Sequence, residues 1–286
     1  MLAPHARART VEVVTRPIPS SSERLPVVGL GSWLTFDVGS DPAARRGCGE
    51  VLAAFFAAGG HLVDSSPMYG SSEEVIGAEL ARIGRYEGLF SATKIWTSGR
   101  IAGRRQAEKS RALWGLARFD LVQVHNLLDW ETHLATLREW KAQGRVRYVG
   151  VTTSHGRRHD LLEEILARER LDFVQFTYSF ADRDAEPRLL PAAAERGVAV
   201  IANRHFDGGA LFSRVAGRKL PGWADEIGCR HWSEVFLKWI VSHPALTCAI
   251  PATSRVDHLR ENMGALSGPL PDAALRRRMT ADWERL

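Results

Sequence analysis

The chain has 286 residues, of which 45% are hydrophobic and 25% charged, and its formal net charge is +5. This length suits one large domain, and no apolar run approaches the ~20 residues that a transmembrane helix needs, so no transmembrane helix is expected. The basic residues are scattered along the chain and are not interleaved with aromatic residues in a known motif, so nucleic acid is not an expected partner.

The N-terminal residues 1–9 are basic, but no apolar signal core follows them. We therefore expect residues 1–15 to form a disordered or extended tail, with a truncated export signal as the alternative. The three cysteines are widely separated and odd in number, which predicts neither a disulfide framework nor a zinc site and indicates a cytoplasmic protein. His155 and His159 are four residues apart, but no third ligand lies nearby, so no metal site is expected.

From residue 16 onward, strand patterns alternate with helical patterns. Two short extended runs, 16–18 and 25–27, flank a serine-rich turn and predict a β-hairpin. Strands are then predicted at 27–31, 61–64, 89–94, 119–125, 146–151, 173–176, 198–202 and 246–250. Helices are predicted at 42–58, from residue 71, and at 104–116, 132–142, 159–168, 187–195, 232–242, 256–266 and 272–284. A long glycine-rich loop is expected at 207–228.

Eight strands alternate with helices at intervals of about thirty residues, which predicts an α/β protein with a (β/α)8 TIM barrel. The barrel would form a single domain over residues 16–286, with the hairpin before it and extra helices at its C-terminus. An open, doubly wound sheet is the alternative. Gly29 and Gly31 do not begin a dinucleotide-binding fingerprint, because no third glycine follows at the required place.

Four polar residues lie at the ends of predicted strands. Asp64 ends the second strand, Tyr69 follows it in the next turn, and Lys94 and His125 end the third and fourth strands. Each residue alone has a structural explanation, such as a helix cap or a packed ring. Because a parallel barrel gathers the carboxyl ends of its strands at one face, we expect the four side chains to converge there.

Such a set suits the reduction of a carbonyl group. The unperturbed pKa of a phenol is near 10, so Tyr69 alone is a poor acid at neutral pH. An ammonium group at Lys94 should lower that pKa, and the Asp64 carboxylate would hold Lys94 in place. His125 would donate a hydrogen bond to the carbonyl oxygen, and Tyr69 would protonate it as a hydride reaches the carbon, a contribution of about 10²–10⁴-fold.

Six segments together resemble the aldo-keto reductase superfamily over residues 18–262. They are 62–70, with tyrosine five residues after aspartate, and 92–94, 120–125, 150–153, 174–179 and 250–262. The resemblance implies that NADP(H), or alternatively NAD(H), binds in an extended form across the barrel mouth without a Rossmann domain.

The same resemblance assigns further residues by position. Thr152, Thr153 and Gln175 would hold the nicotinamide carboxamide, and Asn203 stands where many relatives stack an aromatic ring on the nicotinamide. The adenosine end would be bordered by Ser254, Arg255, Glu261 and Asn262, with Arg255 as the candidate for the adenosine phosphate. The substrate pocket would be lined by Trp33, Trp96 and Trp130. Ala252 and His258 replace a frequent lysine and a frequent arginine, so two familiar phosphate contacts are missing.

The sequence therefore predicts an NADP(H)-dependent reductase of a small-molecule carbonyl substrate, acting as a monomer or weak homo-oligomer. One alternative is a regulatory barrel that binds the cofactor without turnover. Another is an isomerase or aldolase barrel in which Lys94 forms a Schiff base.

Overall fold

The computed structural model describes residues 13–84 and 88–286. Eight parallel strands form its central sheet, in the order of the chain. They are β3 (Leu30–Gly31), β4 (Leu62–Asp64), β5 (Phe90–Ile95), β6 (Phe119–Val124), β7 (Val146–Thr152), β8 (Phe173–Thr177), β9 (Ala199–Asn203) and β10 (Leu246–Ala249). Parallel bridges from Val28 to Ala249 and from Gly31 to Ala252 join the first strand to the last. The predicted (β/α)8 barrel is thereby confirmed.

The first strand is shorter than predicted, and the backbone at its two glycines approaches neighbouring segments at very short range. A Cβ atom on Gly31 would lie 2.7 Å from the carbonyl oxygen of Ile250, and one on Gly29 would lie 2.8 Å from that of Leu62. Only glycine permits this approach of two backbones. Gly29 and Gly31, which do not form a dinucleotide-binding fingerprint, therefore allow the strands of the barrel to pack closely.

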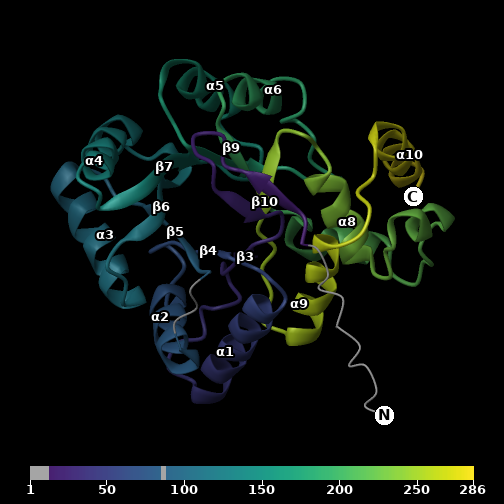
Figure 1. Cartoon of the computed structure of the whole chain (residues 1–286), viewed down its shortest axis with the longest axis horizontal. Helices are drawn as coiled ribbons and strands as arrows, with labels where there is room; N and C mark the ends of the chain where they lie inside the picture. Colours follow the sequence, from purple (N-terminus) through teal and green to yellow (C-terminus); the bar gives the residue numbers. More distant parts are fainter. Residues whose placement is uncertain (1–12, 85–87) are drawn as a thin grey trace, which may run out of the picture.

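Helices surround the ring of strands (Figure 1). They are α1 (Pro42–Ala57), α2 (Ser72–Ile83), α3 (Arg100–Trp114), α4 (Trp130–Ala142), α5 (His159–Arg168), α6 (Leu189–Glu195), α8 (Trp232–Val241), α9 (Val256–Met263) and α10 (Ala273–Glu284). Their buried side chains pack on the outer faces of the strands in one continuous core cluster. This arrangement follows the helical spacing of apolar residues in the sequence.

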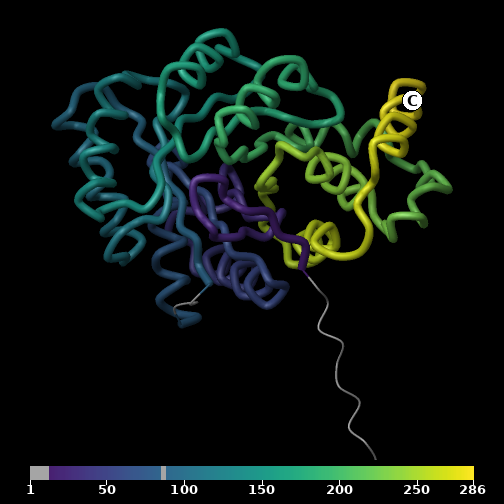
Figure 2. The backbone as a smooth tube through the Cα atoms, turned by 45° about the horizontal axis from the view of Figure 1, so that its top comes forward, coloured from purple at the N-terminus to yellow at the C-terminus, as the bar shows by residue number. Residues whose placement is uncertain are grey.

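The segment predicted as a glycine-rich loop contains regular structure. It holds α7 (Ala210–Arg214) and two short 3-10 helices, η2 (Asp207–Gly209) and η3 (Gly222–Ile227). The segment lies beside α10, which packs outside the ring (Figure 2). The indole nitrogen of Trp223 donates a hydrogen bond to Asp282 at 2.8 Å. These tertiary contacts stabilise turns that the local sequence does not predict.

A second cluster of buried side chains fills the inside of the barrel. The predicted hairpin, formed by β1 (Thr15–Pro17) and β2 (Arg24–Pro26), contributes Ile18 and Leu25 to this cluster. At the turn of the hairpin, the hydroxyl of Ser21 lies 2.9 Å from that of Tyr148, near the start of β7. The hairpin therefore closes the end of the barrel where the strands begin.

Residues 1–12 lie outside the described residues, so the predicted tail and the extent of the single domain stay predictions. Val14 is described, and its backbone N–H donates a hydrogen bond to the carbonyl oxygen of Leu266 at 2.8 Å. The cysteines Cys48, Cys229 and Cys248 are all buried and free. Among the described residues, no helix is both long enough and apolar enough to span a membrane.

Candidate active site

The four polar residues predicted at the strand ends come together at the open face of the barrel. Asp64 is the last residue of β4, Lys94 is the penultimate residue of β5, and His125 directly follows β6. Tyr69 lies in the turn between β4 and α2, where its backbone N–H donates to the carbonyl oxygen of Ser66. Gly70 completes this turn with a φ of +58°, a conformation that favours glycine.

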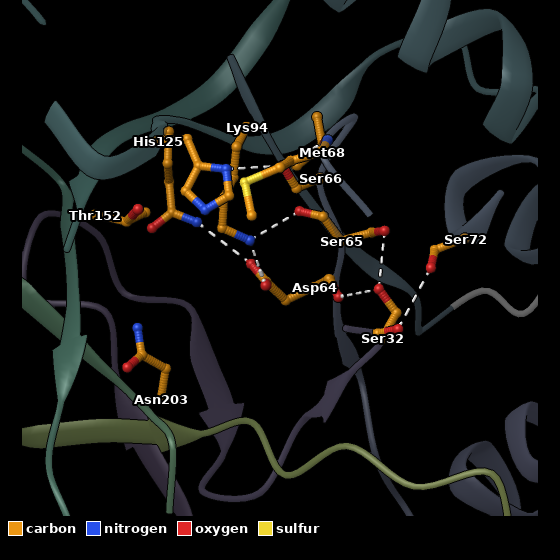
Figure 3. Close-up of polar contacts among 12 residues, drawn as sticks. Ser32, Asp64, Ser65, Ser66, Met68, Ser72, Lys94, His125, Thr152 and Asn203 are labelled. Carbon is orange, nitrogen blue, oxygen red and sulfur yellow. Dashed lines mark hydrogen bonds and ion pairs between the residues drawn. The ribbon is translucent and has the colours of Figure 1, made fainter. Parts of the chain in front are cut away.

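Lys94 and Asp64 form a buried ion pair. The Nζ atom of Lys94 lies 2.5 Å from Oδ2 of Asp64 and donates to the carbonyl oxygen of Ser65 at 2.8 Å (Figure 3). Gln123 donates to the other carboxylate oxygen of Asp64 at 3.4 Å. Burial disfavours the charge on Lys94, but Asp64 and Tyr69 favour it more strongly, so the pKa of Lys94 is raised. Lys94 is therefore a fixed cation.

Tyr69 stands between this cation and His125. The Nζ atom of Lys94 lies 5.1 Å from the centre of the phenol ring, and the ring meets the imidazole of His125 edge to face at 5.7 Å. Burial raises the pKa of Tyr69; Lys94 offsets part of this rise, and Asp64 adds to it. Lys94 thus lowers the pKa of Tyr69 as expected, but desolvation outweighs the attraction of the ammonium, and the pKa lies above its ordinary value.

His125 is held by a residue that the sequence did not indicate. The hydroxyl of Ser66 lies 2.9 Å from Nδ1 of His125 and accepts a hydrogen bond from the backbone N–H of Met68 at 3.2 Å. A Ser66 hydroxyl that accepts from Met68 and donates to Nδ1 selects the tautomer with the imidazole proton on Nε2, the one that can donate to a carbonyl oxygen. Burial and the charge of Lys94 lower the pKa of His125 to about 2, so the ring is neutral.

Tyr69 and His125 line a cavity of about 690 Å³ at the barrel mouth. Trp33 also lines it, as predicted for the substrate pocket. Trp96 and Trp130 are not among the described residues that line this cavity, so their assignment to the substrate pocket stays a prediction. Trp96 is 43% exposed, with its backbone bound to the side chain of Gln106, and Trp130 packs against the outer core.

The predicted nicotinamide contacts also line the cavity, and two of them are unsatisfied. The hydroxyl oxygen of Thr153 and the Nε2 atom of Gln175 are buried without a hydrogen-bond partner in the described structure. Gln175 is near enough to lower the pKa of Asp64, although its Nε2 atom has no partner within bonding distance. Buried polar atoms normally find partners, so this pair fits a ligand with a carboxamide.

Thr152 and Asn203 already have protein partners. Thr152 accepts a hydrogen bond from the backbone of Asn126 at 3.2 Å. The amide of Asn203 donates to the carbonyl oxygen of Thr153 at 2.9 Å and accepts from the hydroxyl of Thr177 at 2.9 Å. Asn203 thus fixes the strand end that carries Thr153, and its side chain cannot stack as an aromatic ring would.

The residues predicted for the adenosine end are not among the described residues that line the cavity. Ser254 and Arg255 precede α9, and Glu261 and Asn262 lie within it. The Arg255 guanidinium pairs in a fork with Asp257, and its Nε–Oδ1 distance is 3.0 Å. Arg255, the candidate residue for binding the adenosine phosphate, therefore already has a counter-ion in Asp257.

Comparison with known proteins places this geometry in a family. The model of the aldo/keto reductase family matches residues 27–279, which is most of the chain. The chain belongs to the aldo/keto reductase family. As a family member it is an NAD(P)H-dependent oxidoreductase, and the resemblance noted in the sequence is confirmed.

A curated relative agrees with this assignment, and solved structures of aldo-keto reductases share the fold. The NADH-specific methylglyoxal reductase of Escherichia coli (strain K12) is 25% identical, over 94% of this chain and 99% of the relative. The holo form of an aldo-keto reductase from Bacillus halodurans has a TM-score of 0.78 at 20% identity, covering 95% of this chain and 96% of that one. An aldo/keto reductase from Klebsiella pneumoniae, in complex with NADP and acetate, has a TM-score of 0.73 at 22% identity, covering 92% and 93%.

Several residues of this reductase's site carry no sequence signal of their own. Ser66 and Gln123 hold His125 and Asp64, and Asp257 pairs with Arg255. Ser66 lies between Asp64 and Tyr69, two residues after the end of β4. That position beside a strand end is the feature of the sequence that could have indicated its role. Within the part of the chain that the structure describes, no cluster of His, Cys, Asp and Glu side chains is arranged to hold a metal ion.

Proposed function

We propose that this reductase converts an aldehyde or ketone to an alcohol, with Tyr69 as the general acid assisted by Lys94, Asp64 and His125. One observation carries the proposal. A buried ammonium, 2.5 Å from its carboxylate partner, lies 5.1 Å from the centre of a phenol ring that lines the same cavity as a neutral histidine. A binding protein without turnover has no need of this arrangement.

The protein's own groups would act on the carbonyl oxygen. The Nε2–H of His125 would donate a hydrogen bond to that oxygen and fix its position. Tyr69 would pass its phenolic proton to the oxygen as the C=O double bond becomes a single bond, leaving a phenolate. Lys94 would stabilise the phenolate, and Asp64 would keep Lys94 in place. The bound nicotinamide supplies the hydride for the carbonyl carbon.

Residues of this chain fit such a cofactor. Thr153 and Gln175 offer the unpaired polar atoms for the carboxamide, and Thr152 lies beside them. Ser254, Arg255, Glu261 and Asn262 would border the adenosine end. We take NADP(H) as the cofactor and NAD(H) as the alternative, since one relative is named NADH-specific and one similar structure contains NADP.

The test is carbonyl-dependent oxidation of NADPH or NADH at 340 nm with a panel of small aldehydes. Replacement of Tyr69 by phenylalanine should lower kcat by about 10²–10⁴-fold without changing cofactor affinity in a fluorescence titration. Tyr148→Phe makes the same chemical change at the closed end of the barrel and is the matched control. Equal turnover by Tyr69→Phe and the unaltered protein would rule out Tyr69 as the acid.

The same experiments separate the alternatives. Cofactor binding without turnover of any aldehyde would support a regulatory barrel. Borohydride trapping of Lys94 with a ketone would support Schiff-base chemistry. The structure favours neither, because a lysine with a raised pKa, hydrogen-bonded to Asp64 and Ser65, lacks the free lone pair that a nucleophile needs.

A further inference from the structure

The wall of the active-site cavity carries an excess of positive charge. Among the described residues that line it, Asp64 is the only acidic one, and its charge is balanced by Lys94. Three guanidinium groups line the same cavity, those of Arg157, Arg158 and Arg204. An uncharged aldehyde or ketone does not account for this charge, so its counterpart is either the anionic cofactor of the proposed function or a negatively charged substrate.

The three guanidinium groups differ in their partners. Arg204 is paired with Asp207 at 2.8 Å and donates to Nε2 of His155 at 2.7 Å. Arg157 and Arg158 have no carboxylate within 4 Å in residues 13–84 and 88–286, the ranges that the structure describes. Arg158 donates one hydrogen bond, to the backbone carbonyl of Asn126 at 3.0 Å. These two arginines therefore keep their charge available for a ligand.

Arg158 lies on the side of the cavity where the carbonyl substrate would bind. It extends from the loop after β7 toward the loop after β6, and its partner Asn126 directly follows His125. The proposed cofactor contacts run the other way, from the ends of β7 and β8 to the region of α9. The negative phosphates of the cofactor would thus lie toward β9 and β10, away from Arg158.

The backbone supports a specific role for this loop. Arg158 has a φ of +58° and Asn126 has a φ of +52°, both in the left-handed region that side chains other than glycine rarely adopt. Such strained residues cluster at ligand sites, where the surrounding structure holds them in place. Arg158 adopts this conformation directly before α5, and its guanidinium reaches the carbonyl oxygen of Asn126, next to His125.

We propose that the substrate of the proposed reductase reaction is a carbonyl compound that also carries a carboxylate group. The carboxylate binds Arg158, with Arg157 beside it, while the carbonyl oxygen faces Tyr69 and His125. A guanidinium binds a carboxylate through two parallel, charge-assisted hydrogen bonds. A substrate carboxylate therefore explains why two arginines at this rim have no carboxylate partner among the described residues. The inference depends on the proposed function only for the reaction, not for the binding of the acid.

The test compares 4-carboxybenzaldehyde with 4-formylbenzamide, which have nearly the same shape and differ in charge. The unaltered protein should show a kcat/KM about 2–5-fold higher for the acid, the range expected for an ion pair with an exposed arginine. In Arg158→Gln this ratio should fall toward one, and Arg157→Gln should have a smaller effect. Arg277→Gln removes an exposed arginine on α10 and should keep the full ratio.

A binding measurement separates this inference from the proposed reaction. Each aldehyde is titrated against the tryptophan fluorescence of the cofactor-free protein, because Trp33 lines the cavity. Tighter binding of the acid, lost in Arg158→Gln, supports the inference even if neither aldehyde is reduced. Equal affinity for acid and amide, or an acid preference that survives Arg158→Gln, overturns it. Weakened NADPH binding by Arg158→Gln would assign the arginine to the cofactor phosphates and also overturn it.

Discussion

The hydroxyl oxygen of Ser66 lies 2.9 Å from Nδ1 of His125, and both side chains are buried. Ser66 is held in turn by the backbone N–H of Met68, in the same turn that carries Tyr69. The turn after β4 thus supplies the proposed acid and also orients the neighbouring imidazole. His125 can present an Nε2–H to a carbonyl oxygen only while Nδ1 is kept as the acceptor.

Replacing Ser66 with alanine should therefore weaken carbonyl binding and turnover without removing any proposed catalytic group. Loss of one neutral hydrogen bond predicts a fall in kcat/KM of about 2–10-fold. Nitrogen-15 NMR of His125 should show a mixture of tautomers in the variant. Ser65→Ala, which removes a neighbouring hydroxyl that contacts Ser32, is the control. A single Nε2–H tautomer in Ser66→Ala would contradict the assigned role.

The pH dependence of reduction follows from the raised pKa of Tyr69. A general acid is active in its protonated form, which persists below its pKa and is lost above it. Because burial moves the pKa of Tyr69 upward, kcat/KM should stay level from about pH 6 to pH 9 and fall only at higher pH. His125, with a pKa of about 2, stays neutral throughout this range. A decline centred near pH 8 would show instead that Lys94 lowers the phenol pKa in the working enzyme.

The buried pair of Lys94 and Asp64 also makes a prediction for stability. Lys94→Met leaves the Asp64 carboxylate buried without its cation, which should lower the free energy of unfolding by about 3–5 kcal/mol. The double replacement Asp64→Asn with Lys94→Met removes both charges and should recover part of that loss. Urea unfolding followed by circular dichroism measures both variants. If the double variant is no more stable than Lys94→Met, an uncompensated charge is not the cause.

Cofactor preference should respond to Asp257. Its carboxylate pairs with Arg255, the candidate ligand of the adenosine phosphate. Asp257→Asn frees the guanidinium and should strengthen NADPH binding by about 2–5-fold while leaving NADH binding unchanged, as expected for an exposed pair. Fluorescence titration with both cofactors measures the change. Adding Arg255→Gln should abolish the gain; a gain that persists would place the phosphate elsewhere.

The sequence predicted the strands and most helices because their apolar spacing is a property of the local chain. It also predicted the convergence of Asp64, Lys94 and His125, since a residue that ends a strand must lie at the barrel mouth whatever the details of packing. For Trp96, the same reasoning does not give the direction of the side chain. A residue one place beyond a strand can turn inward or outward, and tertiary packing decides which. The side chain of Gln106 binds the Trp96 backbone, and Trp96 is 43% exposed.

The contacts that support the site could not be predicted from the sequence for the same reason. Ser66 meets His125 across 59 residues, and Gln123 meets Asp64 across 59 residues. The balance between burial and charge that sets the pKa of Tyr69 depends on how deeply the ring is enclosed. Likewise α7, within a glycine-rich stretch, forms where a five-residue helix buries Leu211 against the core, a gain that local propensity does not reveal.

Ile18 and Leu25 complete a packed barrel interior, so within the described residues the site is reached from the mouth where Tyr69 and His125 lie. Under the proposed function, cofactor and substrate would therefore share one entrance, and a bound molecule of either kind would restrict the arrival and release of the other.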